Sequence, residues 1–160
     1  MAAGSGAVFF SGHSLMDNPM PDDAAAIAAS MGRSTLWNQQ NVLGALIRVR
    51  TRGMSTDDAS FSGYRQGKNR EGANMDVVGE LRAPKTVSGL RYDAMVITER
   101  HDIASAVQYE DTVRYARHFH ERLVEGNASA ATYLYHSWLD VDKSNPAAWV
   151  AYERAAAPVW

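Results

Sequence analysis

A serine that follows a short apolar run is the residue of this chain best suited to nucleophilic chemistry. The run is residues 7–10, Ala-Val-Phe-Phe, and it breaks at Gly12, two residues before Ser14. An apolar run of this length bounded by glycine is typical of a buried strand. A serine at the carboxyl end of such a strand lies where open α/β sheets form their ligand crevices. This placement suits a nucleophile, and a solvated strand-to-loop turn is the alternative with the same local pattern.

Two histidines also follow predicted strands. His101 comes after the third predicted strand and His136 comes after the fourth. Because the carboxyl ends of parallel strands meet at one edge of a sheet, both are expected on the same side as Ser14. A histidine at that edge can take the serine proton as a general base. The alternative is that these are inert loop residues.

The loop that starts at His136 combines aromatic and acidic side chains. Trp138 is the tryptophan expected nearest a pocket, and Asp140 or Asp142 is the candidate to orient His136 through its other ring nitrogen. The loop therefore offers one route to a general base with a carboxylate partner.

Two further histidines lie within one predicted helix. His118 and His120 are two positions apart, so their side chains diverge by about 200° and do not form a metal site. His118 is expected to face solvent and His120 to lie near the core. His13 neighbours Ser14 and is expected at the rim of the pocket.

Three arginines alternate with other residues after the second predicted strand. Arg48, Arg50 and Arg52 would share one face if the strand continued, with more cationic residues at 65–70. Recognition of an anionic group on a substrate is one interpretation, because guanidinium groups bind such groups well. A solvated edge is the other.

The elements that must position these residues alternate along the chain. Strands are predicted at 7–10, 36–43, 92–98 and 131–135, and helices at 24–31, 77–81, 110–124 and 146–157. This order favours a parallel sheet with helices on both faces. Asn145 is expected to cap the last helix, with Pro146 at its first position. The stripe expected along the helix at 110–124 is Val113, Ala116, Phe119, His120 and Leu123. Residues 51–76 are rich in Gly, Ser, Asp and Arg and are expected to form a long irregular insertion, either a lid or a disordered loop.

The composition excludes several classes of protein and several kinds of site. The chain has 160 residues, 46% hydrophobic and 21% charged, as in one soluble globular domain. Its net charge of -2 gives no electrostatic basis for nucleic-acid binding. The lack of cysteine excludes disulfides, thiolate metal sites and cysteine nucleophiles. No apolar run is long enough to span a bilayer, and no signal-peptide pattern opens the sequence, so a cytoplasmic or a mature chain is expected.

The residues around Ser14 resemble a known family motif. Gly12-His13-Ser14-Leu15 resembles the first motif of the SGNH (GDSL-type) hydrolases, where aspartate stands in place of His13. The resemblance implies that Ser14 is the nucleophile and that its backbone N–H joins an oxyanion hole. The second motif of the family is a glycine after strand two. Gly44 lies there, 30 residues after Ser14, and is implied to supply a second N–H.

The other two motifs match less closely. The third is Gly-x-Asn-Asp after strand three, and the stretch here is Thr-Glu-Arg-His-Asp at 98–102. An ungapped alignment places His101 at the asparagine, which donates to the oxyanion, and Glu99 is the competing choice. The fourth motif, Asp-x-x-His with the general base, does not occur in this sequence. Either the chain is a fragment of a longer protein, or the base comes from elsewhere within it.

The resemblance implies a three-layer α/β/α sandwich with a parallel, flavodoxin-like sheet, short of its last strand. The expected function is hydrolysis of small-molecule carboxylic esters by Ser14, with no cofactor and no metal. His13 and Trp138 are the expected substrate contacts. The alternative is a non-catalytic or truncated SGNH-like domain that binds a ligand or a partner chain. A missing strand would expose a sheet edge able to pair with a second copy.

Overall fold

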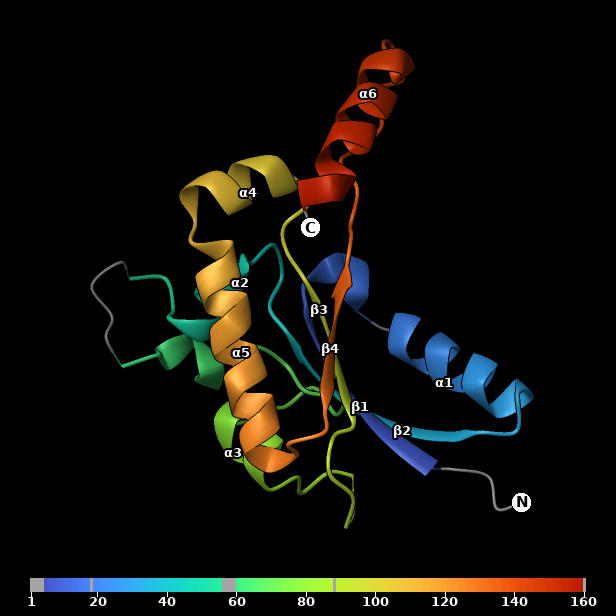
Figure 1. The fold of residues 1–160 in the computed structure, drawn as a ribbon, viewed down its shortest axis with the longest axis vertical. Helices are drawn as coiled ribbons and strands as arrows, with labels where there is room; N and C mark the ends of the chain where they lie inside the picture. The colour runs from blue at the N-terminus through green and yellow to red at the C-terminus, as the bar shows by residue number, and fades with distance from the viewer. Residues whose placement is uncertain (1–4, 18, 56–59, 88, 160) are drawn as a thin grey trace.

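The predicted parallel sheet is present. The computed structural model describes residues 5–17, 19–55, 60–87 and 89–159, and within them four parallel strands form one sheet in the order β2-β1-β3-β4 (Figure 1). The strands are β1 (Ser5–Gly12), β2 (Ser34–Asn41), β3 (Ala94–Thr98) and β4 (Ala131–Tyr135). Every pairing is parallel, so the carboxyl ends of all four strands lie at one edge.

Helices cover both faces of the sheet, which makes a three-layer α/β fold. Helix α1 (Met20–Ser30) packs on one face, against β2, over a cluster that contains Phe10 and Trp37. Helices α3 (Val77–Arg82) and α5 (Thr112–Gly126) cover the other face (Figure 1). There Phe9, Met95 and Ile97 are completely buried in the main core cluster. Successive residues of β1 thus point to opposite layers, as the strand period requires.

Shorter elements surround the carboxyl edge of the sheet. They are the 3₁₀ turn η1 (Ser14–Met16), α2 (Ile47–Thr51), the 3₁₀ turn η2 (Ser62–Arg65), α4 (Ile103–Tyr109), α6 (Pro146–Ala156) and the 3₁₀ turn η3 (Ala157–Val159). We call residues 136–159 the C-terminal arm. In Figure 1 its helix α6 extends beyond the body of the sheet and ends near α4. None of the helices in the described ranges has the length and apolarity that crossing a membrane requires.

The structure corrects several predicted elements. The sequence allows residues 46–50 either to continue the second strand or to start a new element, and they start a new element, because α2 begins at Ile47. Helix α5 begins at Thr112 and buries Tyr115, Phe119 and Leu123, whereas Val113, expected on the buried stripe, is 60% exposed. The buried stripe is set by the residues that pack into the main core cluster, which the apolar spacing alone does not identify. Helix α4 was missed, although Asp102 accepts a hydrogen bond from Ser105 N as an N-cap does.

The described part of the predicted insertion at 51–76 packs against β2 and α2. The buried amide of Gln40 donates to the carbonyl oxygens of Gly63 and Gln66, at 2.9 and 3.2 Å. A β-carbon on Gly63 would lie 2.2 Å from the Val49 carbonyl oxygen, so only glycine allows this approach. Lys68 pairs with Asn41 in an isolated antiparallel bridge. These contacts hold the described part of the segment against the body of the fold. Residues 56–59 of the predicted insertion lie outside the described ranges.

Candidate functional site

Ser14 and Gly44 lie in neighbouring loops at the carboxyl edge of the sheet. Both are exposed, and Gly44 has a φ of +65° with open space where a side chain would stand. Two hydrogen bonds join the loops, from Val42 N to Gly12 O at 3.0 Å and from Asn41 Nδ2 to His13 O at 3.1 Å. The loop that carries Ser14 is therefore fixed to the loop that carries Gly44.

His13 lies beneath the site and does not reach its rim, contrary to prediction. The residue is 2% exposed, and its Nε2 lies 3.0 Å from the Glu99 carbonyl oxygen. A carbonyl only accepts, so Nε2 carries the hydrogen and Nδ1 accepts from Leu15 N at 3.4 Å. Burial is the main cause that lowers the pKa of His13, and the nearby Arg50 charge adds to it. A neutral ring with both nitrogens engaged positions the Ser14 turn and is not free to act as a base.

Glu99 is likewise a buried acceptor. Its side chain accepts three hydrogen bonds, from Ile47 N at 3.1 Å, Arg100 N at 2.7 Å and Thr112 Oγ1 at 2.7 Å. The residue is 1% exposed. A carboxylate held in this way stabilises the start of α2 and the end of β3. It has no hydrogen to offer an oxyanion, so the geometry favours His101 over Glu99 for that role.

His101 is partly buried and lies close to the Ser14 turn. Its ring centroid is 6.3 Å from that of His13, in an edge-to-face arrangement. The two histidines of α5, His118 and His120, are engaged elsewhere. His118 Nδ1 lies 2.8 Å from Tyr64 Oη and stacks on Phe61, so it does not simply face solvent as predicted. His120 Nδ1 lies 2.9 Å from Thr132 Oγ1.

His136 has a carboxylate neighbour, but not the predicted one. Its Nε2 lies 3.4 Å from Glu153 Oε2 on α6, close enough for an ion pair but not aligned as a hydrogen bond. Asp142 instead accepts hydrogen bonds from Ser144 and Asn145, which lowers its pKa and closes the turn before α6. Trp138, in the same arm, is 48% exposed.

A buried arginine that sequence reasoning placed on a basic surface organises the edge from below. Arg50 is 0% exposed and donates from Nε to Ser11 Oγ at 3.1 Å, from Nη1 to Ala45 O at 2.6 Å and from Nη2 to Thr98 O. It thus joins the ends of β1 and β3 to the loop that carries Gly44. Burial lowers its pKa to about 10, which still leaves it charged at neutral pH. No local pattern marks Arg50, because two of its three acceptors, on Ser11 and Thr98, come from distant parts of the chain.

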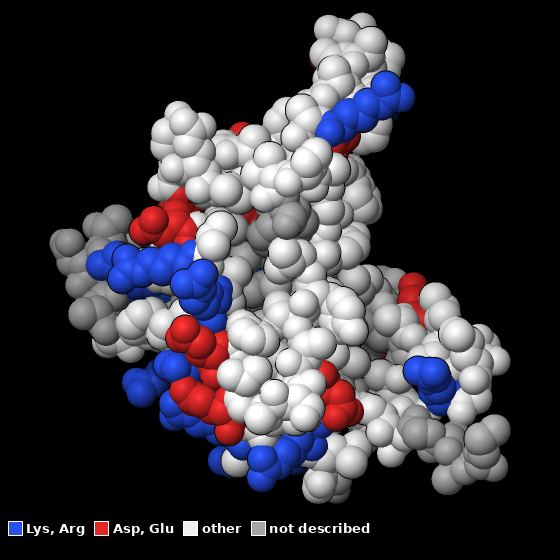
Figure 2. Space-filling view, in the orientation of Figure 1, with Lys and Arg blue, Asp and Glu red and all other residues white. Residues whose placement is uncertain are grey.

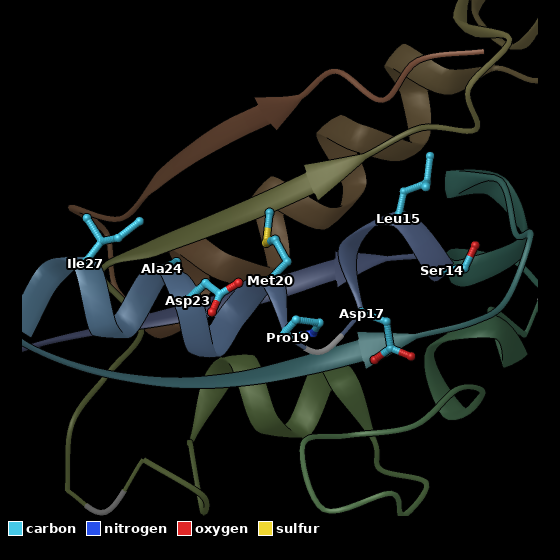
Figure 3. Close-up of a pocket in the computed structure, with 8 residues that line it drawn as sticks. All are labelled: Ser14, Leu15, Asp17, Pro19, Met20, Asp23, Ala24 and Ile27. Carbon is cyan, nitrogen blue, oxygen red and sulfur yellow. The ribbon is translucent and has the colours of Figure 1, made fainter. Parts of the chain in front are cut away.

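Ser14 also borders a hollow of about 470 Å³ that runs along α1 (Figure 3). Leu15, Met20 and Ile27 supply apolar walls, while Asp17 and Asp23 supply carboxylates. In Figure 3 the Ser14 hydroxyl lies at one end and points away from Met20 and Ile27. The hollow therefore lies on the side of Ser14 opposite to its hydroxyl. Within the described ranges, no group of three or more His, Asp or Glu residues is arranged to hold a metal ion.

Comparison with known proteins shows the fold and no more. No protein-family model matches this sequence, and no curated protein matches it. A crystal structure of a DUF4886 family protein from Bacteroides uniformis ATCC 8492 is similar, with a TM-score of 0.62 over 98% of this chain at 9% identity. The chain spans 59% of the length of that protein. At this identity the similarity supports the α/β architecture alone.

Proposed function

We propose that this chain is a serine hydrolase of the SGNH type that cleaves carboxylic esters of small molecules. One observation carries the proposal. An exposed Ser14 and an exposed Gly44 of positive φ lie in neighbouring loops at the same edge of the sheet. A serine hydroxyl beside free backbone N–H groups is the arrangement that acyl transfer needs. The Gly-His-Ser-Leu resemblance adds the assignment of Ser14 as nucleophile.

In the proposed reaction, Ser14 Oγ bonds to the ester carbonyl carbon while its proton passes to a histidine. The negative charge that develops on the carbonyl oxygen is stabilised by the N–H groups of Ser14 and Gly44 and by a His101 N–H. Collapse of this intermediate breaks the bond to the alcohol, which leaves with the proton from the histidine. Water then attacks the acyl-serine in the same way and releases the acid.

We assign the base to His136. His101 already has the oxyanion role in this proposal, both ring nitrogens of His13 are engaged, and His118 and His120 bond to Tyr64 and Thr132. His136 is the histidine with a carboxylate beside it, and Glu153 would stabilise the imidazolium that forms. The arm that carries His136 is joined to β3 by a hydrogen bond of 3.1 Å from Ser137 Oγ to Glu99 O.

The test is hydrolysis of 4-nitrophenyl acetate by the wild type, Ser14→Ala and His136→Gln, with His120→Gln as the matched control. We expect Ser14→Ala to lose all enzymatic turnover, His136→Gln to lose about a hundredfold or more in kcat, and the control to retain its rate. An organophosphonate probe should label Ser14 in the wild type. Equal background rates in the wild type and Ser14→Ala would refute the hydrolase proposal.

A second candidate function, binding of a partner chain, is favoured by the exposure of β4. Tyr133 and Leu134 on this edge strand are 60% and 46% exposed. The sequence from 127 to 139 has no charged residue, and Figure 2 shows an uncharged surface along β4 beside the charged side of α5. Natural edge strands usually carry charges that prevent pairing, so β4 is suited to pair with the β4 of a second copy.

Light scattering across a concentration series tests this second candidate. We expect a dimer whose population rises with concentration and falls in Leu134→Lys, with Val113→Lys on the exposed side of α5 as the matched control. A monomer at the highest concentration would rule out self-association through β4.

A further inference from the structure

A second hollow of about 470 Å³ opens on the other side of the proposed site, directly at Gly44. Leu43, Leu46, Val49 and Met54 give it apolar walls. Because Gly44 is the proposed oxyanion donor, a chain attached to the ester carbonyl could extend into this hollow, as it could into the hollow along α1 that Ser14 borders.

Two cations line this hollow without full use of their hydrogen-bonding groups. Arg48 donates from Nε to Glu110 Oε2 at 2.7 Å, while its Nη1 is buried with no hydrogen-bond partner among the described residues. The Arg100 side chain makes no hydrogen bond or ion pair with any described residue, and only its backbone N donates, to Glu99 Oε1. Glu110 offsets one of the two charges, which leaves a net positive charge at the hollow.

A buried guanidinium N–H with no acceptor is costly and is expected to have a partner in the functional state. The natural partner of two arginines is an oxyanion such as a carboxylate, because guanidinium groups bind it through paired, charge-assisted hydrogen bonds. The apolar walls between Gly44 and the arginines indicate that this anion is attached to a carbon chain. Free phosphate or sulfate would leave those walls uncovered.

We propose that the hollow at Gly44 is an acyl subsite for a terminal carboxylate, so that the preferred substrates are half-esters of aliphatic dicarboxylic acids. The inference rests on the proposed function of Ser14 and specifies its substrate class. The hollow along α1 has the opposite character, since Asp17 and Asp23 line it and would repel such an anion. The two hollows on either side of the site thus direct an anionic acyl chain toward Gly44.

The kinetic test compares 4-nitrophenyl hydrogen adipate with 4-nitrophenyl hexanoate, whose acyl chains have equal length and differ in the terminal carboxylate. The adipate chain is long enough that its carboxylate does not readily attack its own ester. We expect kcat/KM to favour adipate by about tenfold, mainly through KM, and added salt to reduce the preference. Arg100→Gln should abolish it, while Arg82→Gln, which removes a cation from the surface of α3, should retain it.

A binding test gives a readout that does not depend on turnover. Ser14→Ala protein is titrated with monomethyl adipate by calorimetry, and then with inorganic phosphate. We expect monomethyl adipate to bind, to bind about tenfold more weakly when Arg100→Gln is added, and to outcompete phosphate. Equal binding of phosphate and monomethyl adipate would overturn the claim that the anion is carried on an apolar chain.

The two tests separate the failure of this inference from the failure of the proposed function. If the wild type shows no Ser14-dependent turnover but monomethyl adipate binds in an Arg100-dependent manner, the hydrolase proposal fails and the anion subsite stands. If turnover depends on Ser14 but adipate and hexanoate esters react equally and monomethyl adipate does not bind, the subsite is refuted and the hydrolase proposal stands. If Arg100→Gln fails to fold, Arg48→Gln carries the same comparison.

Discussion

The loops after β1, β2 and β3 and the arm after β4 meet at one edge of the sheet, but they are held there by different contacts. The first three are joined from below by buried polar groups, with Arg50, Gln40 and Glu99 each bonded to several partners. The arm is mostly exposed and is tied by single contacts such as Tyr152 Oη to Asp102 Oδ1 at 2.8 Å. The residues proposed to stabilise an oxyanion are therefore fixed rigidly, and the residue proposed as base is not.

The largest expected effect is a loss of stability when a buried polar group beneath the first three loops is replaced. Arg50→Met leaves Ser11, Ala45 O and Thr98 O without their donor, so we expect unfolding free energy to fall by about 3–5 kcal/mol. Urea unfolding monitored by tryptophan fluorescence measures it. Arg154→Met in the exposed arm is the control and should leave the midpoint unchanged. Similar midpoints for the two variants would mean that the two regions are held equally.

The second effect distinguishes a loss of stability caused by backbone strain from a loss of catalytic activity. Gly44 and Gly32 both have positive φ, +65° and +73°, with open space at the β-carbon. Alanine at either position should cost about 1 kcal/mol of stability, because the strain is the same. Only Gly44→Ala should also lower kcat for 4-nitrophenyl acetate, because only Gly44 lies in the loop that is hydrogen-bonded to the Ser14 loop. Parallel losses of kcat in both variants would remove Gly44 from the proposed oxyanion hole.

A smaller effect appears only at acidic pH. Burial holds the pKa of His13 below its ordinary value of 6.5, so the folded state resists taking up that proton while the unfolded state does not. The stability linked to His13 is therefore complete above about pH 6.5 and is lost as pH falls through the folded pKa. The decrease in unfolding free energy between about pH 7.5 and about pH 5 should be smaller in His13→Gln than in the wild type.

Two neighbours of His13 bear on this measurement. Arg50 and His101 both lower its pKa further, and His118 elsewhere in the chain has a pKa lowered mainly by burial. His13→Gln should thus remove part of the acid sensitivity, and His13→Gln with His118→Gln should remove more. An unchanged pH slope in the double variant would show that these rings do not carry the effect.

The smallest effect is expected in the arm. Tyr152→Phe removes one hydrogen bond at the N-terminus of α4 and should lower unfolding free energy by about 0.5–1 kcal/mol, with the fold intact. Hydrogen exchange should show faster opening confined to residues 136–159. A global loss of protection would mean that the arm is part of the cooperative core.

Prediction from sequence succeeded where the signal is local. The strand at 131–135 matches β4, and Asn145 accepts from Ala148 N as the N-cap of α6, with Pro146 at the first helical position. Failure came where distant contacts decide. Residues 47–51 form a helix because Glu99, 52 residues away, accepts from Ile47 N and Arg50 reaches the end of β3. Asp140 or Asp142 was predicted to orient His136, but Glu153 lies beside His136 and a local turn satisfies the Asp142 carboxylate.

The sequence by itself determined the alternation of strands and helices, the break of β1 before Ser14 and the glycine at 44, because apolar periodicity and turn residues act over a few positions. Only the tertiary structure decided that His13 is neutral and buried, that Arg50 lies beneath the site and that Arg48 and Arg100 line one hollow. The charge state and partners of a side chain depend on its burial and on neighbours from other strands, which sequence separation does not reveal.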